Sequence, residues 1–188
     1  MWYLNNRVWT PWAFQGNAFS DNECDDIIAT LDKLEIKDAS IGVANELKSN
    51  IRSNSIGWVT PNDDTRWFYD KISEVTHNMN NQFWNFDLES IPELQFTKYA
   101  NIGDNYNYHI DICPGSSPTY RKLTFSIQLT DENDYEGCDL EFMPGNDIAP
   151  RGRGTISFFP SFTTHRVTPL ISGERNALVG WVCGPNFK

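Results

Sequence analysis

The chain has 188 residues, of which 39% are hydrophobic and 14% aromatic. This length and composition indicate one globular domain with a sizeable core and exclude a disordered chain. The formal net charge of −10 disfavours broad electrostatic binding to nucleic acid or to an anionic membrane. No signal peptide is visible, and no apolar run reaches the length of about 20 residues that spans a bilayer, so a cytoplasmic protein is expected.

Two helices are expected in the first half of the chain. Residues 1–19 are aromatic and interrupted by Pro and Gly, which favours one or two short edge strands. Ser20 and Glu23 have the spacing of a capping box, which predicts that a helix begins there. Apolar residues then recur with helical spacing at Cys24, Ile27, Ile28, Leu31 and Leu34.

The second helix is expected after a short strand at 55–60 that Pro61 ends. Residues 62–64 (Asn-Asp-Asp) offer candidate N-caps. His77 lies away from the apolar stripe and is interpreted as a solvated residue, not as a metal ligand. The stripe itself predicts that this helix packs flat on a sheet, and it consists of Phe68, Ile72, Val75, Met79 and Phe83.

From Leu94 onward, short β-rich runs alternate with Gly- and Pro-containing turns. This spacing predicts an antiparallel sandwich or jelly roll, supported by the two helices. We therefore expect one domain over 1–188, with 1–94 as support and 95–188 as the core that carries the site. The expected strands are 94–100, 122–130, 139–142, 154–159, 165–170 and 176–183.

The four cysteines form no CxxC pair, and their spacing matches no zinc module. We interpret them as buried or free thiols in a reducing compartment. They are Cys24, Cys113, Cys138 and Cys183.

A candidate metal centre begins at His109 and Asp111. Residues two apart on a strand point to the same face, so both side chains can reach one ion. His165 lies in an apolar stretch where an imidazole without a partner would be costly. Two imidazoles and one carboxylate are the ligand set of non-haem Fe(II) sites with open positions. A surface pair at 109 and 111, and a hydrogen-bonded core histidine at 165, are the alternatives.

Arg175 follows His165 by ten residues and precedes an apolar strand. An arginine that points into a sandwich needs an anion, and its planar fork binds a carboxylate through two parallel hydrogen bonds. The alternative is a turn residue that pairs with Glu174. Four residues are candidates for apolar walls around such a site, and packing in the core is the alternative for each. They are Phe125, Ile127, Phe158 and Trp181.

The ordered set of these segments resembles the Fe(II)/2-oxoglutarate-dependent dioxygenases, specifically their prolyl-4-hydroxylase-like branch. Weaker similarity to small bacterial and phage members extends back through Trp58 and Arg52 to the helix at Ser20. The residues that carry the resemblance are Tyr99 and the segments 108–111, 121–129, 134–142, 152–155, 158–161, 165–167 and 173–181.

The resemblance implies a double-stranded β-helix, mainly β, with the two N-terminal helices packed on the major sheet. It assigns Fe(II) to His109, Asp111 and His165. It assigns the distal carboxylate of 2-oxoglutarate to Arg175 and suggests Tyr99 as a second donor to that co-substrate. L-Ascorbate is a candidate reductant. The residue two after Arg175 is an alanine, whereas some family members carry a hydroxyl residue there.

The resemblance also implies that dioxygen and 2-oxoglutarate are consumed and that a C–H bond is hydroxylated with release of succinate and CO2. A prolyl or other residue of a protein or peptide is the expected substrate, and the loops 101–108 and 112–120 would contact it. A free small molecule or a nucleobase is the alternative, and Trp181 with the acidic charge disfavours the nucleobase. The alternative outside the enzymes is a non-catalytic β-sandwich that binds metal or ligand without turnover.

Overall fold

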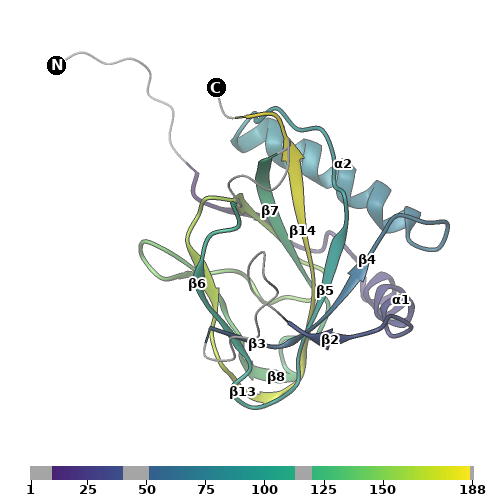
Figure 1. Cartoon of the computed structure of the whole chain (residues 1–188), viewed down its shortest axis with the longest axis vertical. Helices are drawn as coiled ribbons and strands as arrows, with labels where there is room; N and C mark the ends of the chain where they lie inside the picture. Colours follow the sequence, from purple (N-terminus) through teal and green to yellow (C-terminus); the bar gives the residue numbers. More distant parts are fainter. Residues whose placement is uncertain (1–9, 40–50, 113–119, 187–188) are drawn as a thin grey trace.

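The computed structural model describes residues 10–39, 51–112 and 120–186. Its strands form two larger antiparallel sheets and one small two-stranded sheet (Figure 1). The seven-stranded sheet has the order β1 (Ala13–Gln15), β11 (Ile156–Pro160), β7 (Tyr120–Gln128), β14 (Arg175–Gly184), β5 (Leu94–Tyr99), β4 (Ser55–Val59) and β2 (Lys37–Asp38).

The second wall of the sandwich is a five-stranded sheet. Its order is β10 (Asp147–Ile148), β9 (Leu140–Phe142), β12 (His165–Val167), β6 (Asn105–His109) and β3 (Arg52–Ser53). The strands β8 (Tyr135–Gly137) and β13 (Leu170–Gly173) form the two-stranded sheet, which lies at the lower end in Figure 1. The predicted mainly-β architecture is therefore confirmed.

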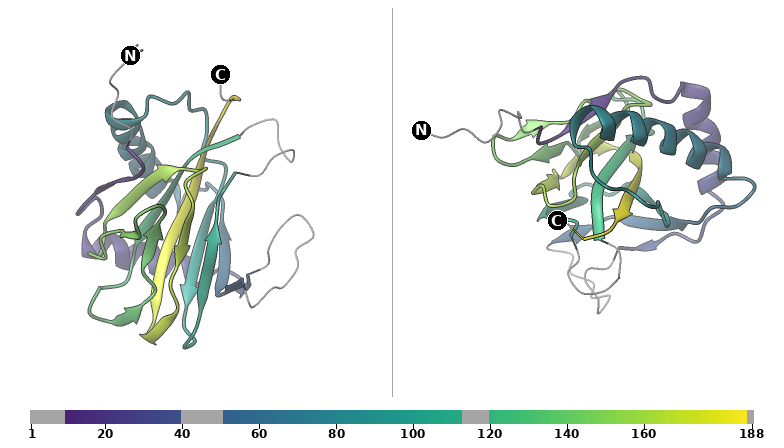
Figure 2. Two further views of the ribbon diagram at one scale, coloured as in Figure 1. Left: turned by 90° about the vertical axis from the view of Figure 1, so that its left-hand side faces the viewer. Right: turned by 90° about the horizontal axis from the view of Figure 1, so that it is seen from above.

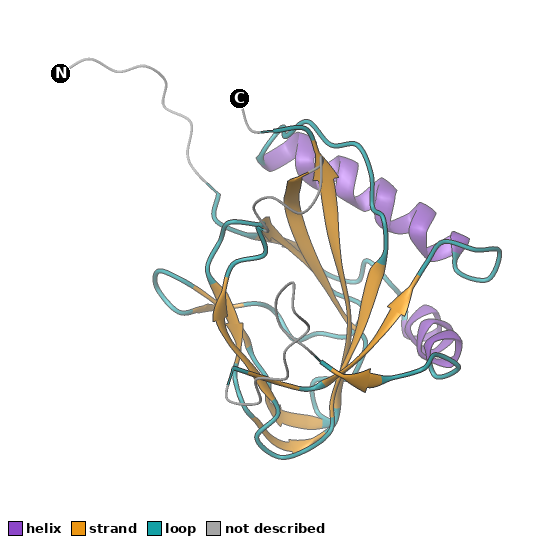
Figure 3. Ribbon diagram, in the orientation of Figure 1, coloured by secondary structure: helices purple, strands orange, loops and turns teal. Residues whose placement is uncertain are grey.

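Both helices, α1 (Asp21–Leu31) and α2 (Arg66–Phe83), lie outside the seven-stranded sheet and leave the interior to the strands (Figures 2 and 3). The predicted capping box is present, since the Ser20 hydroxyl accepts from the Glu23 backbone and the Glu23 carboxylate accepts from the Ser20 backbone. Within the described residues, neither helix is long and apolar enough to cross a membrane.

The predicted caps of α2 at residues 62–64 are wrong. The helix begins at Arg66, and its N-cap Thr65 makes no side-chain capping bond. Asn62 instead uses its side-chain oxygen to accept from the backbone amides of Asp64 and Thr65, a local turn that competes with capping. The apolar stripe is as predicted, with Phe68, Ile72, Val75 and Met79 buried and Phe83 packed against the same core; His77 is exposed.

Side chains along β7 alternate between two faces of the seven-stranded sheet. One face packs under the helices and the other faces the space between the two sheets. Odd-numbered residues from Leu123 to Leu129 join the apolar core under the helices, whereas Thr124 and Gln128 face the interior with their polar groups. Phe125, Ile127 and Phe158 belong to the helix-side core. Three of the four candidate site walls are therefore core residues, and only Trp181 lies near the candidate site.

Each of the six strands expected after Leu94 corresponds to a strand in the structure, with one split. The segment 165–170 divides into β12 and the start of β13. Pro169, which has no backbone N–H to give to a ladder, lies at the break, and Thr168 bonds to Asp139 instead. At the N-terminal side, the edge strand expected within 1–19 is β1, whose residues pair with β11.

Candidate metal centre and co-substrate pocket

Two strands of the five-stranded sheet bring the three predicted metal ligands together. His109 ends β6, Asp111 follows two residues later, and His165 begins β12 directly opposite His109 in the ladder. The imidazole ring centroids of the two histidines are 4.1 Å apart. One ligand atom from each of the three residues lies within 4.8 Å of the others, so the predicted grouping is present.

Both imidazoles are held in the orientation that a metal needs. The Nδ1 atom of His109 lies 2.7 Å from the Asn107 carbonyl, and that of His165 lies 2.9 Å from the Thr163 carbonyl. A carbonyl only accepts, so in the neutral form of each imidazole Nδ1 carries the proton and Nε2 presents the lone pair. Each Nε2 lies 3.6 Å from a different oxygen of Asp111, which is beyond hydrogen-bond length and suits a shared cation.

The carboxylate of Asp111 is fixed by β7 and by the turn after β11. The Thr124 hydroxyl donates to its Oδ2 atom over 2.8 Å, and Thr124 in turn lies 3.0 Å from the Ser161 hydroxyl. The Asp111 backbone donates to the Ser161 carbonyl over 2.8 Å. Bonds of this kind orient a metal ligand and tune its basicity.

The protonation states of His109 and Asp111 also suit metal binding. Burial lowers the pKa of His109 to about 4, and the neighbouring His165 adds to that effect. Burial alone would raise the pKa of Asp111, but the two imidazoles and the Thr124 hydroxyl outweigh it and hold this pKa below the ordinary carboxyl value. Neutral imidazoles and an ionised carboxylate are the forms that bind metal.

A column of stacked side chains packs against the imidazole of His109. The Tyr106 ring stacks on the imidazole with a centroid distance of 3.5 Å, and the Arg52 guanidinium lies 4.5 Å from the Tyr106 ring. Arg52 is buried and donates to Asn54 and Gln95. On the interior side of the sheet, Phe159 packs against His165 at 4.5 Å. The imidazoles therefore have little freedom to rotate.

Arg175 is buried in the sandwich and does not pair with Glu174. Its Nε atom donates to the Gln128 side-chain oxygen over 3.0 Å, and Gln128 donates to the Tyr135 hydroxyl. Glu174 instead pairs with Lys98, so the turn-residue alternative is wrong. The Nη groups have no carboxylate partner among the described residues. They belong to a pocket lined by polar side chains, among them Ser126, Gln128, Tyr135, Thr155 and Ser157.

Tyr99 lies opposite Arg175 in the β5–β14 ladder. Its ring centroid is 5.6 Å from the guanidinium carbon of Arg175. Burial raises the pKa of Tyr99 to about 12, so the hydroxyl keeps its proton at neutral pH and can donate. This location agrees with the predicted second donor to a co-substrate, and that role stays a prediction.

Several supporting residues were missed from the sequence. Thr124 and Gln128 could have been found, because they alternate with apolar residues along one strand and so must face the other side of the sheet. The stack of Tyr106 on His109 carries no sequence signal of its own. The predicted substrate loop at 112–120 lies mostly outside the described residues, as does Cys113. The other three cysteines are buried.

Fold and site together define a jelly-roll protein in which two histidines and one carboxylate form a candidate metal site. The donor set fits Fe(II), because this facial arrangement of two imidazoles and a carboxylate is the ligand set of non-haem iron oxygenases.

Comparison with known proteins agrees with this class. No family model matches the chain. A PKHD-type hydroxylase of Synechococcus sp. strain CC9605 is 37% identical over 86 residues, covering 44% of this chain and 38% of the relative. A match to a PKHD-type hydroxylase of Shewanella baltica is 31% identical over 100 residues and covers 50% of this chain and 44% of that relative. The chain thus spans less than half the length of these curated relatives.

The similarity in fold covers nearly the whole chain. A prolyl-4-hydroxylase from Pseudomonas putida superposes with a TM-score of 0.72 at 20% identity, covering 94% of both chains. These comparisons confirm the resemblance to 2-oxoglutarate- and Fe(II)-dependent oxygenases of the prolyl-4-hydroxylase-like type. They also confirm the predicted double-stranded β-helix with two helices on its major sheet.

Proposed function

We propose that this protein is an Fe(II)- and 2-oxoglutarate-dependent hydroxylase that inserts oxygen into a C–H bond and releases succinate and CO2. The observation that carries the proposal is the pairing of two oriented Nε2 atoms with the ionised Asp111. The buried fork of Arg175, without a carboxylate partner among the described residues, supports it. A sandwich that binds metal without turnover would have no need of that second group.

The metal ligands would be His109, Asp111 and His165. When bound, Fe(II) would supply the activation of dioxygen, coupled to oxidative decarboxylation of the co-substrate. The protein's own contribution is orientation. The backbone carbonyls of Asn107 and Thr163 keep the protons on Nδ1, so that both imidazoles present lone pairs to the same point.

Arg175 would bind the distal carboxylate of 2-oxoglutarate. Gln128 holds its Nε atom, which fixes the plane of the guanidinium and leaves the Nη donors for a bidentate pair. The protonated Tyr99 hydroxyl would donate a second hydrogen bond. The buried setting strengthens both contacts because competing water is excluded.

A prolyl residue of a protein or peptide is the first substrate to test, since the neighbours in fold are named prolyl hydroxylases. The same chemistry on a free small molecule is the second candidate. L-Ascorbate would act as a reductant that returns the iron to its Fe(II) state.

The experiment compares two histidines of the same chain. Protein purified without oxygen is mixed with Fe(II), 2-oxoglutarate and then dioxygen, and bound iron and succinate are measured. His109→Ala should lose iron binding and lower succinate formation at least about 100-fold. His77→Ala is the matched control, because His77 is exposed on α2, and it should behave as the wild type.

Absence of iron binding by the wild type, or succinate formation that His109→Ala leaves intact, would overturn the proposal. The substrate is then sought in panels of prolyl peptides and metabolites, by a mass gain of one oxygen atom that depends on 2-oxoglutarate.

A further inference from the structure

The arginines of this acidic protein fall into two groups. Arg7 lies outside the described residues, and four of the others form ion pairs: Arg66 with Asp70, Arg151 with Asp139, Arg153 with Asp25 and Arg166 with Glu141. The remaining three, Arg52, Arg121 and Arg175, have no carboxylate partner among the described residues. All three lie near the candidate site. Arg121 contacts Asp111, Arg52 lies on the Tyr106 ring that stacks on His109, and Arg175 lines the pocket.

Little in the rest of the chain can neutralise these three charges. Outside the described ranges, the only acidic side chain is that of Glu46. Under the proposed function, 2-oxoglutarate neutralises Arg175. Arg52 is buried but donates to two amide oxygens and lies over a tyrosine ring. Among the described residues, Arg121 contacts the Asp111 carbonyl at 3.4 Å and lies 3.8 Å from the ring of Trp181.

A buried donor without an acceptor lies next to Arg121. Trp181 is 8% exposed, and its Nε1 atom has no hydrogen-bond partner among the described residues. The Arg121 guanidinium connects this indole to Asp111, because it lies 3.8 Å from the Trp181 ring and its Nη1 atom lies 3.4 Å from the Asp111 carbonyl oxygen. An unsatisfied buried N–H is costly, so an indole N–H beside a metal ligand and under a guanidinium indicates a place for an acceptor.

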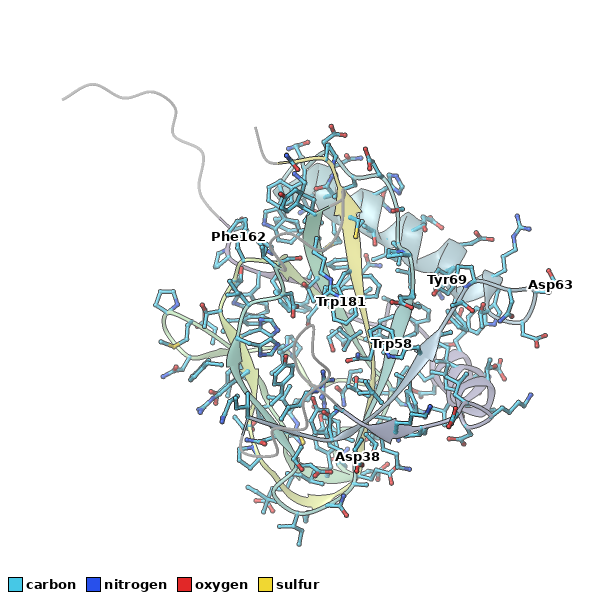
Figure 4. All side chains as sticks on the ribbon, viewed as in Figure 1. Asp38, Trp58, Asp63, Tyr69, Phe162 and Trp181 are labelled. Atoms are coloured by element: carbon cyan, nitrogen blue, oxygen red, sulfur yellow. The ribbon has the colours of Figure 1, made fainter. Side chains whose placement is uncertain are left out.

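The same corner has an apolar surface that reaches solvent. Trp58 on β4 is 43% exposed, and its ring centroid lies 6.0 Å from that of Trp181. Figure 4 shows the two indoles near each other; they come from β4 and β14, which are separated in the sheet by β5. The corner therefore combines an exposed aromatic face, an indole N–H donor and a cation that contacts the proposed metal ligand Asp111.

We propose that the substrate carries a carboxylate that binds to Arg121 and to the Trp181 N–H, while its apolar part packs on Trp58. This inference rests on the proposed function, because it names the substrate class of that same site. The carboxylate belongs either to a free acid or to an acidic side chain of a peptide. A neutral isostere leaves the guanidinium and the indole N–H without an anion, which gives strong discrimination.

The test uses two pairs of probes that match in shape and differ in charge. One pair is N-acetylproline and N-acetylprolinamide. The other is acetyl-Glu-Pro-amide and acetyl-Gln-Pro-amide. Binding is measured by ligand-observed NMR on protein loaded with 2-oxoglutarate and Zn(II), a metal without redox chemistry. The acid of at least one pair should bind at least about tenfold tighter than its amide, and the pair that shows this preference identifies the source of the carboxylate.

Variants distinguish binding of the carboxylate at Arg121 from a general effect of the protein's charge. Arg121→Gln should reduce the acid preference to within about twofold, and Arg121→Lys, which keeps the charge, should retain most of it. Arg66→Gln removes one positive charge from the exposed start of α2 and should change neither the preference nor uncoupled succinate formation. Circular dichroism of each variant confirms folding.

The proposal is overturned if neither pair shows an acid preference, or if Arg121→Gln weakens acid and amide equally. These outcomes are distinct from failure of the proposed function. Binding to the zinc-loaded protein requires no turnover, whereas the proposed function fails only when iron binding or succinate formation fails.

Discussion

Phe158 and Phe159 are adjacent on β11, and they belong to different parts of the molecule. Phe158 is fully buried in the core under the helices, where it packs against Phe125. Phe159 is 1% exposed on the opposite face, where it contacts Phe142 and the proposed metal ligand His165. The seven-stranded sheet thus separates a face that stabilises the fold from a face that builds the site, by the two-residue period of a strand.

The helix-side face is almost wholly apolar. Its tight packing explains why residue 180 is a glycine. A Cβ atom at Gly180 would lie 2.3 Å from the Phe125 ring and 2.6 Å from a Leu94 methyl group. The interior face instead buries polar groups, and Thr124 and Gln128 each have hydrogen-bond partners there. Burial alone does not identify core residues in this protein; the face does.

The largest expected effect on stability concerns the adjacent residues Phe158 and Phe159. Phe158→Ala and Phe159→Ala should each lower the free energy of unfolding by about 3–5 kcal/mol, because each leaves a cavity in a packed region. Only Phe159→Ala should also weaken metal binding by the folded protein, since His165 loses its neighbour. Denaturant unfolding and metal titration measure the two effects.

Should the alanine variants fail to fold, Phe158→Leu and Phe159→Leu preserve most of the volume and keep the comparison measurable. Equal loss of metal affinity in both members of the pair would contradict the separation of the two faces.

The second prediction concerns the co-substrate pocket on the interior face. Arg175→Gln removes a bidentate charge-assisted pair with the distal carboxylate, at a cost of about 3 kcal/mol, so the KM for 2-oxoglutarate should rise about 100-fold. Initial rates of succinate formation at varied 2-oxoglutarate measure this change. The neighbouring Glu174→Gln is the control, because Glu174 pairs with Lys98; an unchanged KM in Arg175→Gln would exclude this role.

The third prediction tests the support of Asp111. Thr124→Val removes the hydroxyl that donates to the Asp111 carboxylate and should lower Fe(II) affinity about tenfold. Thr97→Val is its match, because Thr97 donates to the Ala177 carbonyl in the same sheet and has no contact with Asp111. Isothermal titration with Fe(II) under anaerobic conditions compares them, and equal affinities in the two variants would show that Thr124 does not tune the site.

The sequence was sufficient for features that depend on neighbours along the chain. The capping box at Ser20 depends on fixed local geometry and is present. His109 and Asp111 also meet as predicted, although Asp111 lies beyond the end of β6 and not within a strand. The grouping of His165 with them needed the fold, which the resemblance supplied. Arg52, which reaches Gln95 across strands, and Trp181 beside Arg121 depend on strand order and register. No pattern within one segment encodes those contacts.

The smallest expected effect lies on the helix side, at the start of α1. The Lys71 ammonium, followed by the Ser20 backbone N–H, holds the pKa of Glu23 below its usual range. A carboxyl group with a lowered pKa stabilises the fold fully above its unfolded pKa of about 4.3, and this contribution is lost as the pH falls through the lower folded value. Glu23→Gln should therefore cost less than about 1 kcal/mol at pH 7, because the pair is partly exposed, and it should cost less at pH 3 than at pH 7. Urea unfolding at both pH values measures the difference, with Glu74→Gln on α2 as the control. A cost that stays the same at both pH values would show that capping geometry, not charge, stabilises this end of the helix.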